Sequence, residues 1–537
     1  MIGTIFFPLS RVITAVVVFF TSTFSGAGLA AAVGSAPPSL DPLPYPAWVH
    51  EHLVWEHHGT QDSTIAFVRG FTSRDIPVGI VNVEADWATS RNSYDPHPDL
   101  YPRMQEMIDG FHAQGIKVLM WTCQMTNEKN WDGTDNPNYL YGKEQGYFLS
   151  GGKTVKWWGG NGALLDYTNP EAVRWHREQM DIIMDMGADG WKLDGTDPYI
   201  WLMFPAMSQK TGFVRFRQYQ RLSYTDFYEY TMEKTGGNGM AWARATDDTI
   251  GWGLPLNFMP RATNFASWAG DQDNDWAGLR GALNTMFTSA MLNYVNLGSD
   301  IGGFRSTPIK PDPEDIFIRW AQLGALCPIM NNGGGGEHRP WMYDERRGDG
   351  ETYVTDIYRE FTKLHHALIP YLSSQAAWSH ERRQPVMRPT LGMYQYMLGD
   401  EIFVAPMYQE GNDRTVVFPA GEWIYMFDES KSYSGVKKLS FTLDEYPVFI
   451  RKGAIIPMEA DGITAINIYP VNGTNQFGLY EEGKRGAMLS YEKDRNGLTF
   501  KATATDRQLL LRIHDDSGIT EIPVPDASAG VEIAIAY

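Results

Sequence analysis

Little in the 537-residue sequence suits a disulfide scaffold or a nucleic-acid-binding protein. Its only cysteines, Cys123 and Cys327, lie in apolar stretches where a buried free thiol is expected, with a single bridge between them as the alternative. Acidic side chains outnumber basic ones by 64 to 45, which gives a net charge of −19. A surface of that sign repels a polyanion, so we expect no nucleic-acid partner.

Three widespread catalytic and nucleotide-binding signatures are also missing. The sequence has no G-x-S-x-G nucleophile elbow, no Walker loop and no G-x-G-x-x-G at the start of a helix. The glycine run at 333–336 follows an apolar stretch but lacks the Lys and Ser or Thr of a phosphate loop. We therefore interpret this run as a flexible active-site loop.

The composition is that of a large globular protein. Apolar residues make up 43% and charged residues 20% of the chain, which excludes disorder and a polytopic membrane protein. The length predicts two to four domains, or one large barrel with appendages. The 18 Trp and 27 Tyr residues favour an enzyme with aromatic-walled clefts, although core packing accounts for most of them.

The N-terminus has the pattern of an export signal. Residues 13–32 are apolar or small, follow Arg11, and precede small residues that suit a cleavage site. We expect residues 1–36 to be a signal peptide and the protein to be secreted or periplasmic. The alternative is a retained single-span membrane anchor, because the stretch approaches the roughly 20 residues that span a bilayer. Residues 37–49 form a predicted Pro-rich linker.

Residues 50–375 alternate short apolar runs with segments of helical spacing, which is typical of βαβ units. Helical spacing is clearest over 63–73, 100–114 and 171–187. Eight strands alternating with helices predict an α/β fold with a closed (β/α)₈ TIM barrel, whose active site lies at the C-terminal strand ends. The eight apolar runs are 52–58, 78–87, 116–124, 188–195, 239–245, 264–272, 294–303 and 325–334.

Beyond residue 375 the pattern changes to strand-like stretches separated by turn residues. This pattern predicts a C-terminal antiparallel β-sandwich region after the barrel. We place a proximal β-sandwich at 376–460 and a distal all-β segment at 461–537.

Carboxylates end several of the predicted barrel strands. Asp194, Asp271 and Asp300 close the fourth, sixth and seventh runs, so they are expected to meet at the barrel mouth. Two carboxyls in one pocket suit glycoside hydrolysis, and Lys192 shares the face of Asp194 and could help to keep it ionised. A single Asp at a strand end is often only a helix N-cap, but three in succession favour a site. Tryptophans interleave with them, namely Trp121, Trp158, Trp191 and Trp268.

Two segments offer metal sites as alternatives. Residues 271–275 begin like a calcium loop, but Trp276 and Ala282 stand where the loop needs Gly and a bidentate Glu. The cluster at 50–58 holds four His and two Glu residues, yet alternate residues of a strand face opposite sides. Glu56, His57 and His58 fit better as polar groups that line a sugar pocket, so we expect no metal site.

These motifs together resemble glycoside hydrolase family 31, the retaining α-glycosidases on a (β/α)₈ barrel. The similarity extends from about residue 52 to about residue 458. GADGWKLDGTDP at 187–198 resembles the strand-4 nucleophile motif of the family, and WAGDQDNDW at 268–276 resembles its strand-6 acid/base motif. Further similar segments are ALLDYTNPEAVRWH, GSDIGGF, IRWAQLGALCP, PVMRP and YQYMLGDEIFVAPM.

The resemblance implies a role for each matching residue. Asp194 would be the nucleophile and Asp271 the acid/base, while Arg244 is the best match for a sugar-binding arginine and Arg261 competes with it. Asp300 would support the site. Pocket roles are implied for Asp86, Trp121, Trp158, Lys192 and Trp268.

The sequence departs from the family pattern in three places. The large β-sandwich that usually precedes the barrel is not found ahead of the first strand, so we expect that wall of the pocket either to come from another segment or to be absent. The Arg-x-His after strand 8 aligns with Asn331-Asn332-Gly333, which leaves His338 or Arg339 as substitutes. The strand-2 Asp-x-Asp is Glu84-Ala-Asp86.

We therefore expect a retaining, exo-acting α-glycosidase that uses a covalent glycosyl-enzyme intermediate and no cofactor. Its partner would be an oligosaccharide, a polysaccharide or another α-glycoside, with glucose, galactose, xylose, N-acetylgalactosamine and sulfoquinovose all open as the sugar. The membrane is a partner only if the N-terminal segment is retained. The alternatives are a transglycosidase or an α-glucan lyase of the same family, a noncatalytic carbohydrate-binding barrel, and a metal-dependent hydrolase.

Overall fold

The computed structural model describes residues 45–194, 197–200, 203–247, 257–306 and 312–536. The predicted signal or anchor at 1–36 and the first part of the predicted linker lie outside these ranges. From Tyr45 onward the linker packs on the barrel: the Tyr45 ring stacks on Phe265 with centroids 4.9 Å apart, and its hydroxyl accepts a bond from Asn296 Nδ2 at 3.0 Å. Within the described ranges, no helix combines the length and apolarity needed to cross a bilayer.

Eight parallel strands form the barrel, in the order β14-β13-β10-β7-β3-β2-β1-β15. A parallel bridge between Asp300 and Asn331 joins the end of β14 to β15 and closes the ring. Each of the eight predicted runs contains one strand, so the predicted (β/α)₈ barrel is confirmed. The strands are β1 (Leu53–Val54), β2 (Ile80–Val83), β3 (Lys117–Thr122), β7 (Gly190–Leu193), β10 (Met240–Ala243), β13 (Ala266–Trp268), β14 (Leu297–Gly298) and β15 (Asn331–Asn332).

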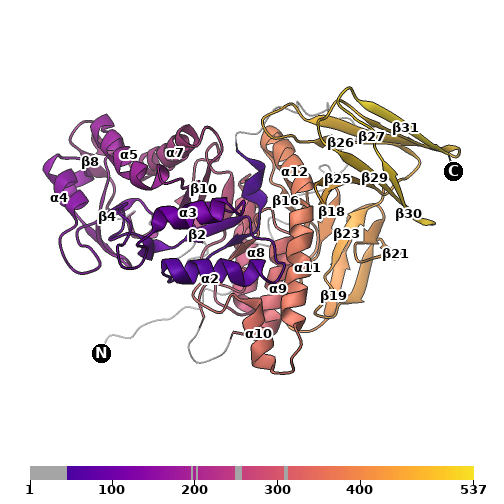
Figure 1. Ribbon diagram of the computed structural model, residues 1–537, viewed down its shortest axis with the longest axis horizontal. Helices are drawn as coiled ribbons and strands as arrows, with labels where there is room; N and C mark the ends of the chain where they lie inside the picture. Colours follow the sequence, from indigo (N-terminus) through magenta and orange to yellow (C-terminus); the bar gives the residue numbers. More distant parts are fainter. Residues whose placement is uncertain (1–44, 195–196, 201–202, 248–256, 307–311, 537) are drawn as a thin grey trace, which may run out of the picture. The chain divides into compact units, whose positions relative to one another are not determined.

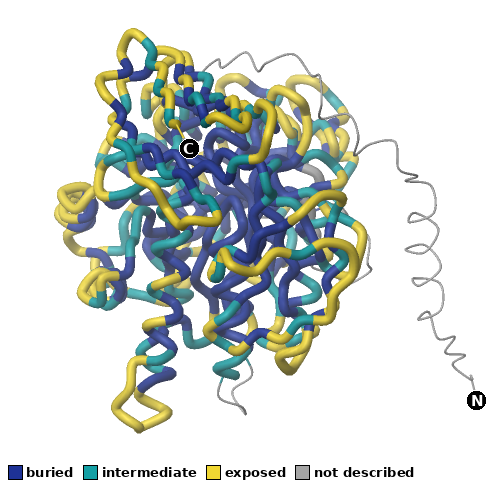
Figure 2. The backbone as a smooth tube through the Cα atoms, turned by 90° about the vertical axis from the view of Figure 1, so that its right-hand side faces the viewer, coloured by how far each residue is buried: buried dark blue, intermediate teal, exposed yellow. Residues whose placement is uncertain are grey.

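The barrel strands are almost entirely buried, as the dark blue centre of Figure 2 shows. Helices cover the outer face and side chains fill the inner face, so these strands read as continuous apolar runs rather than alternating ones. Two neighbouring barrel strands, β7 and β10, approach each other closely at Gly190. A Cβ at this position would lie 1.9 Å from the Met240 carbonyl oxygen, and the φ of Gly190 is +148°. Only glycine lets β7 and β10 lie this close together.

Helices follow the strands, and α2, α5 and α8 each begin at a side-chain cap. Thr60 and Ser63 form a reciprocal capping box at the start of α2, and Asn169 caps α5 just ahead of Pro170. The helix predicted over 100–114 begins only at Met104, because Pro102 disfavours helical backbone at the residue before it. The helices are α2 (Gln61–Thr72), α3 (Met104–His112), α5 (Pro170–Met184), α7 (Phe216–Lys234), α8 (Trp276–Met291), α9 (Glu314–Ala325), α10 (Pro340–Arg347), α11 (Tyr353–Ala367) and α12 (Ile369–Arg382).

The connections after β3 and β7 are long and carry small elements of their own. The first contains α4 (Pro137–Glu144) and an antiparallel sheet in the order β4-β6-β5. The second contains the hairpin β8–β9. Both leave C-terminal strand ends, where a barrel builds its site. The strands are β4 (Met125–Asn127), β5 (Val155–Trp157), β6 (Gly160–Leu164), β8 (Ala206–Ser208) and β9 (Gly212–Val214).

The C-terminal region consists of β-sheets, as expected (Figure 1). A six-stranded sheet, β16-β17-β18-β23-β20-β21, and the pair β19-β22 come first. Two four-stranded sheets follow, β24-β25-β29-β30 and β26-β27-β28-β31. All pairs are antiparallel except β25 with β29, which is parallel. The boundaries predicted at 375 and 460 lie inside α12 and at the end of β24.

These strands are short in the proximal sheets and longer in the distal ones. They are β16 (Met387–Pro389), β17 (Tyr396–Leu398), β18 (Ile402–Val404), β19 (Asp413–Val417), β20 (Trp423–Tyr425), β21 (Asp428–Tyr433), β22 (Val436–Ser440), β23 (Val448–Arg451), β24 (Ile455–Ala460), β25 (Ile463–Ile468), β26 (Gly473–Leu479), β27 (Ala487–Lys493), β28 (Gly497–Ala502), β29 (Leu509–Asp515), β30 (Gly518–Pro523) and β31 (Val531–Ala536).

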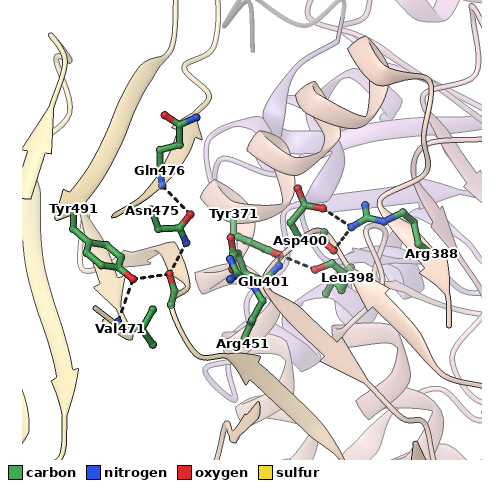
Figure 3. A network of polar contacts seen from close by, with 12 residues as sticks. Tyr371, Arg388, Leu398, Asp400, Glu401, Arg451, Val471, Asn475, Gln476 and Tyr491 are labelled. Atoms are coloured by element: carbon green, nitrogen blue, oxygen red, sulfur yellow. Dashed lines mark hydrogen bonds and ion pairs between the residues drawn. The ribbon is translucent and has the colours of Figure 1, made fainter. Parts of the chain in front are cut away.

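A polar network joins α12 to these sheets (Figure 3). The Tyr371 hydroxyl of α12 donates to the Leu398 carbonyl at 2.7 Å and accepts from the Glu401 amide at 3.0 Å. Arg451 of β23 pairs with the Glu401 carboxylate at 2.6 Å. Two residues farther along the chain, the Gly453 carbonyl accepts from Asn475 of the distal sheet at 2.5 Å. These hydrogen bonds and the ion pair thus connect a helix, a proximal sheet and a distal sheet.

A second contact fastens the barrel helix α9 to the loop between β22 and β23. Arg319 is fully buried, and its guanidinium donates to the carbonyls of Phe441 at 2.8 Å and Glu445 at 2.7 Å. Gln322, one turn farther on, donates to the Leu443 carbonyl at 2.6 Å. Burial lowers the pKa of Arg319, so the main-chain oxygens are what make the charge tolerable there.

Replacing Arg319 tests this junction. Arg319→Leu leaves two buried carbonyls unpaired, so we expect the free energy of unfolding to fall by about 3 kcal/mol. Urea denaturation followed by tryptophan fluorescence should also separate into two steps as the sheets lose their hold on the barrel. Arg174→Leu, at an exposed position with a loose ion pair, should change stability by less than about 0.5 kcal/mol. Equal effects of the two substitutions would contradict the proposed junction.

Candidate active site

Two carboxylates and one guanidinium meet at the C-terminal mouth of the barrel. Asp194 directly follows β7, Asp271 follows β13, and Arg244 follows β10, which lies between those strands in the sheet. Arg244 Nη2 lies 3.0 Å from Asp194 Oδ1 and 2.7 Å from Asp271 Oδ1. The arginine side chain is 6% exposed, while the two carboxylates are 15% and 26% exposed. The cation therefore offsets the repulsion between two acids that a ligand can still reach.

The backbone at Gly270 permits this arrangement. Its φ is +87°, and a Cβ there would lie 3.2 Å from Arg244 Nη1. A side chain at this position would be strained and would press on the guanidinium. Glycine thus allows the segment with Asp271 to turn directly over Arg244.

Asp194 has a second partner on the neighbouring strand. Trp121 of β3 donates its indole N–H to Asp194 Oδ2 at 3.3 Å. The Asp194 amide donates to the Thr122 carbonyl at 2.9 Å and fixes the backbone beneath the carboxylate. The two oxygens of Asp194 thus face an indole and a guanidinium, which fixes the direction of the side chain.

Lys192 does not pair with Asp194, contrary to our expectation. Its Nζ lies 2.6 Å from Glu84 Oε1 and 3.3 Å from the Trp55 ring centroid, and the side chain is 5% exposed. Lys192 lies two residues earlier on β7 and therefore one layer deeper in the barrel, where the carboxylate after β2 reaches it. Burial raises the pKa of Glu84 even though the Lys192 cation acts in the opposite direction.

Asp300 is almost completely buried between β14 and β15. Its Oδ1 accepts from Asn331 Nδ2 at 2.6 Å, and Asn331 Oδ1 accepts in turn from the Trp55 indole at 2.8 Å. Asp300 Oδ2 is buried and has no hydrogen-bond partner among the described residues. Burial raises the pKa of Asp300 to about 8. The Lys192 cation opposes this rise, and the negative charge of Asp271 adds to it. We therefore expect Asp300 to carry a proton at neutral pH.

The remaining predicted pocket residues lie around this centre. Asp86 sits in the short helix η2 (Ala85–Trp87) and accepts from His58 Nδ1 at 2.8 Å. Trp158, in the turn between β5 and β6, is 52% exposed and meets Trp121 edge to face at 5.9 Å. Trp268 ends β13, and the Arg244 guanidinium lies 5.3 Å from its ring centroid.

His338 is buried beneath the glycine run at 333–336. Its Nδ1 donates to the Ile301 carbonyl at 3.0 Å, and burial lowers its pKa to about 4, so the ring is neutral at pH 7. A Cβ on Gly334 would lie 2.6 Å from His338 Nε2. The other predicted substitute, Arg339, instead pairs with Glu337 at 2.7 Å.

The structure separates the two candidate sugar-binding arginines. Arg244 contacts both carboxylates, whereas Arg261 is exposed and donates to the Leu292 carbonyl at 3.0 Å. Sugar binding by Arg244 remains a prediction.

The residues of the calcium-like segment face different partners. Asp273 pairs with Arg305 at 2.7 Å, and Asp275 caps α8 by accepting from the Gly278 amide at 2.7 Å. In the first cluster, His50 and His52 are buried and bond backbone carbonyls. Across the described ranges, no three His, Cys, Asp or Glu side chains group as metal ligands would.

Sequence reasoning missed Arg91 and Trp131. Arg91 is buried in the loop after β2, and its guanidinium carbon lies 3.5 Å from the Trp131 ring centroid and 5.6 Å from that of Trp121. Neither residue closes a strand, which was the signal we followed. Their positions in loops after β2 and β3, on the site side of the barrel, were the remaining clue.

Comparisons with known proteins agree with this architecture. The model of the glycosyl hydrolases family 31 TIM-barrel domain matches residues 42–375, and that of the family 31 C-terminal domain matches residues 383–456. The chain therefore belongs to glycosyl hydrolase family 31.

Over the aligned segments, about a quarter of the residues of this chain are identical to those of its relatives. An alpha-xylosidase of Emericella nidulans is 26% identical over 78% of this chain and 54% of its own length. A sulfoquinovosidase of Escherichia coli is 27% identical over 65% of this chain and 52% of its own length. The chain thus spans about half the length of these relatives. A family 31 dextranase of Flavobacterium johnsoniae, solved with glucose, shares the fold with a TM-score of 0.79 at 18% identity, covering 92% of this chain and 71% of that one.

Asp300→Asn tests whether the buried carboxyl is protonated. A folded-state pKa near 8 lies above the unfolded value of about 4, so its contribution to stability is complete below pH 4 and is lost as the pH rises through 8. Asparagine does not titrate. Relative to the wild type, the variant should therefore gain roughly 2–4 kcal/mol between pH 5 and pH 9 in urea denaturation.

The exposed Asp273 supplies the control for this experiment. Asp273→Asn should follow the wild-type pH dependence closely. A difference between Asp300→Asn and the wild type that stays constant with pH would mean that Asp300 is ionised throughout.

Proposed function

We propose that this protein is a retaining, exo-acting α-glycosidase that removes terminal α-linked sugars through a covalent glycosyl-enzyme intermediate. The contact of Arg244 Nη2 with both carboxylates carries the proposal. Because that nitrogen lies 3.0 Å from Asp194 Oδ1 and 2.7 Å from Asp271 Oδ1, the two oxygens are closer than the roughly 6.5 Å minimum of inverting enzymes. Too little room remains between them for the attacking water of an inverting reaction.

In the first step, Asp194 attacks the anomeric carbon and forms an ester bond to it. Asp271 must enter this step protonated, with Arg244 paired to the ionised Asp194, and it gives that proton to the departing glycosidic oxygen so that the leaving group departs as an alcohol. Trp121 and Arg244 hold the Asp194 carboxylate in one orientation for this attack. As Asp194 loses its charge to the ester, the Arg244 cation is left to Asp271.

In the second step, Asp271 takes a proton from water, and the hydroxide attacks the anomeric carbon of the ester. The sugar leaves with its original anomeric configuration, and Asp194 is restored as a carboxylate. Protonated Asp300 adds no third negative charge to this centre. An acceptor sugar in place of water would give transglycosylation, which is the second candidate outcome, since an isomaltosyltransferase of Sporosarcina globispora is 26% identical over 68% of this chain.

Substitution of the two carboxylates tests the assignment. With the aryl α-glycoside that the wild type hydrolyses fastest, Asp194→Asn should lower kcat by about 10⁴-fold. Asp271→Ala should lower it by about 10²–10⁴-fold for a poor alcohol leaving group and far less for an activated phenol. The panel comprises α-glucosides, galactosides, xylosides, N-acetylgalactosaminides and sulfoquinovosides, and NMR identifies the first anomer released.

Asp273→Asn is the matched control, because this exposed carboxylate lies two residues from Asp271 and pairs with Arg305. Its activity should equal that of the wild type. An inverted product, or unchanged turnover in Asp194→Asn, would contradict the proposal. Addition of acceptor sugars to the same assay separates hydrolysis from transfer.

We also propose that residues 1–36 direct export, on the grounds of their apolar and small-residue composition. Expression of the full chain in a bacterial host should give protein outside the cytoplasm whose first residue, by N-terminal sequencing, lies near residue 33 or 37. An intact N-terminus in the membrane fraction would instead identify an anchor.

A further inference from the structure

We propose that Trp131 and Trp158, held by Arg91, form a platform that binds the leaving-group side of an oligosaccharide substrate. This inference rests on the proposed exo-glycosidase function and names the substrate class, an α-linked oligosaccharide of at least three sugar units. Trp158 was expected to line the pocket, whereas Trp131 and Arg91 were not.

The platform begins at the catalytic centre and leads outward. Trp121 donates to Asp194 and is 3% exposed, and Trp158 meets its ring edge to face at 5.9 Å. Trp158 is 52% and Trp131 42% exposed. An exo-acting enzyme places the terminal sugar at the buried end of such a series, so the exposed rings face the part of the substrate that leaves.

Arg91 ties the three indoles together. Its guanidinium carbon lies 3.5 Å from the ring centroid of Trp131, 4.9 Å from that of Trp158 and 5.6 Å from that of Trp121. Among the described residues, the Nε and Nη1 atoms of Arg91 have no hydrogen-bond partner, although the side chain is more than nine-tenths buried. Stacking on aromatic faces is thus what holds this charge in place, and it fixes the exposed rings relative to the catalytic acids.

The loop that carries Arg91 is held by hydrogen bonds and has a locally strained backbone. Asn92 and Tyr94 both have positive φ, +55° and +60°, which is uncommon for Asn and an outlier for a bulky aromatic residue. Thr122 donates to Asn92 Oδ1 at 2.9 Å, and the Tyr94 hydroxyl lies 3.0 Å from His176 Nε2. Asn92 also donates to the Cys123 carbonyl. Strain of this kind persists where surrounding contacts enforce it, and it concentrates at functional sites.

Trp131 is fixed from its own side as well. Its indole N–H donates to the Ala88 carbonyl at 2.7 Å, and its amide donates to the Thr89 carbonyl at 3.1 Å. One ring face rests on the guanidinium, which leaves the other surface of this 42% exposed side chain open. A flat, immobile aromatic surface beside polar groups suits the apolar C–H face of a pyranose, and it costs little conformational entropy on binding.

Kinetics over substrate length test the platform. For the sugar that the wild type hydrolyses, the nitrophenyl monosaccharide is compared with the trisaccharide of the same α-linked sugar. Trp131→Ala should raise KM for the trisaccharide by about tenfold, with kcat unchanged and less than about a twofold effect on the nitrophenyl substrate. Trp131→Tyr, which keeps a flat ring, should restore most of the loss.

Phe427→Ala is the control, because Phe427 is a 47% exposed aromatic residue between β20 and β21 of the C-terminal sheets. It should leave both substrates unaffected. Equal changes for the two substrates in Trp131→Ala, or the same chain-length effect in Phe427→Ala, would overturn the platform while the proposed function stands.

Absence of turnover on every glycoside would instead remove the proposed function. In that case calorimetric titration of the wild type and Trp131→Ala with maltotriose and isomaltotriose decides the platform separately. Weaker binding to the variant supports it. Equal affinity of the two proteins, or no binding to the wild type, overturns it.

Discussion

The site depends on one guanidinium that keeps two carboxylates together. Asp194 and Asp271 follow strands that are not adjacent, and β10 between them supplies Arg244 to both. Arg244 attracts both carboxyl groups, so the pair stays together whether Asp271 is ionised or carries the proton that the proposed first step requires. The order of three strands in the barrel and the absence of a side chain at Gly270 are therefore conditions for the chemistry.

A second set of ionisable groups, Lys192, Glu84 and Asp300, lies deeper in the barrel than the two carboxylates at its mouth. Lys192 and Glu84 neutralise each other against the Trp55 ring, and burial raises the pKa of Asp300, which favours its neutral form. Buried charges are tolerable when they are paired, and a buried carboxyl with one unpartnered oxygen is tolerable when it is neutral. The barrel interior thus has fixed charges that do not compete with the acids at its mouth.

Most of the fold could be predicted from the sequence because each barrel strand is part of a short apolar run that ends in polar or aromatic residues. Asp194 and Asp271 were found for the same reason, whereas Arg244 was implied only by the resemblance to the family, with Arg261 as a competitor. Partners were harder to predict. The ion pair of Lys192 with Glu84 crosses the barrel interior, and Arg91 meets Trp131 from a different loop, so neither follows from local spacing. The parallel pairing of β25 with β29 likewise depends on contacts between distant segments rather than on strand pattern.

The junction between α9 and the loop at 441–445 uses only main-chain oxygens on the loop side. Arg319 and Gln322 donate to backbone carbonyl oxygens of the loop, so these bonds depend on the course of its backbone and not on the identity of its side chains. An exposed residue of that loop such as Asp444 can therefore vary during evolution at little cost to the junction, provided that the loop keeps its length and shape, whereas the buried Phe441 packs near Tyr425 and is constrained. Substitutions should be tolerated at the exposed loop position and resisted on the helix, so that two surfaces in contact evolve at different rates.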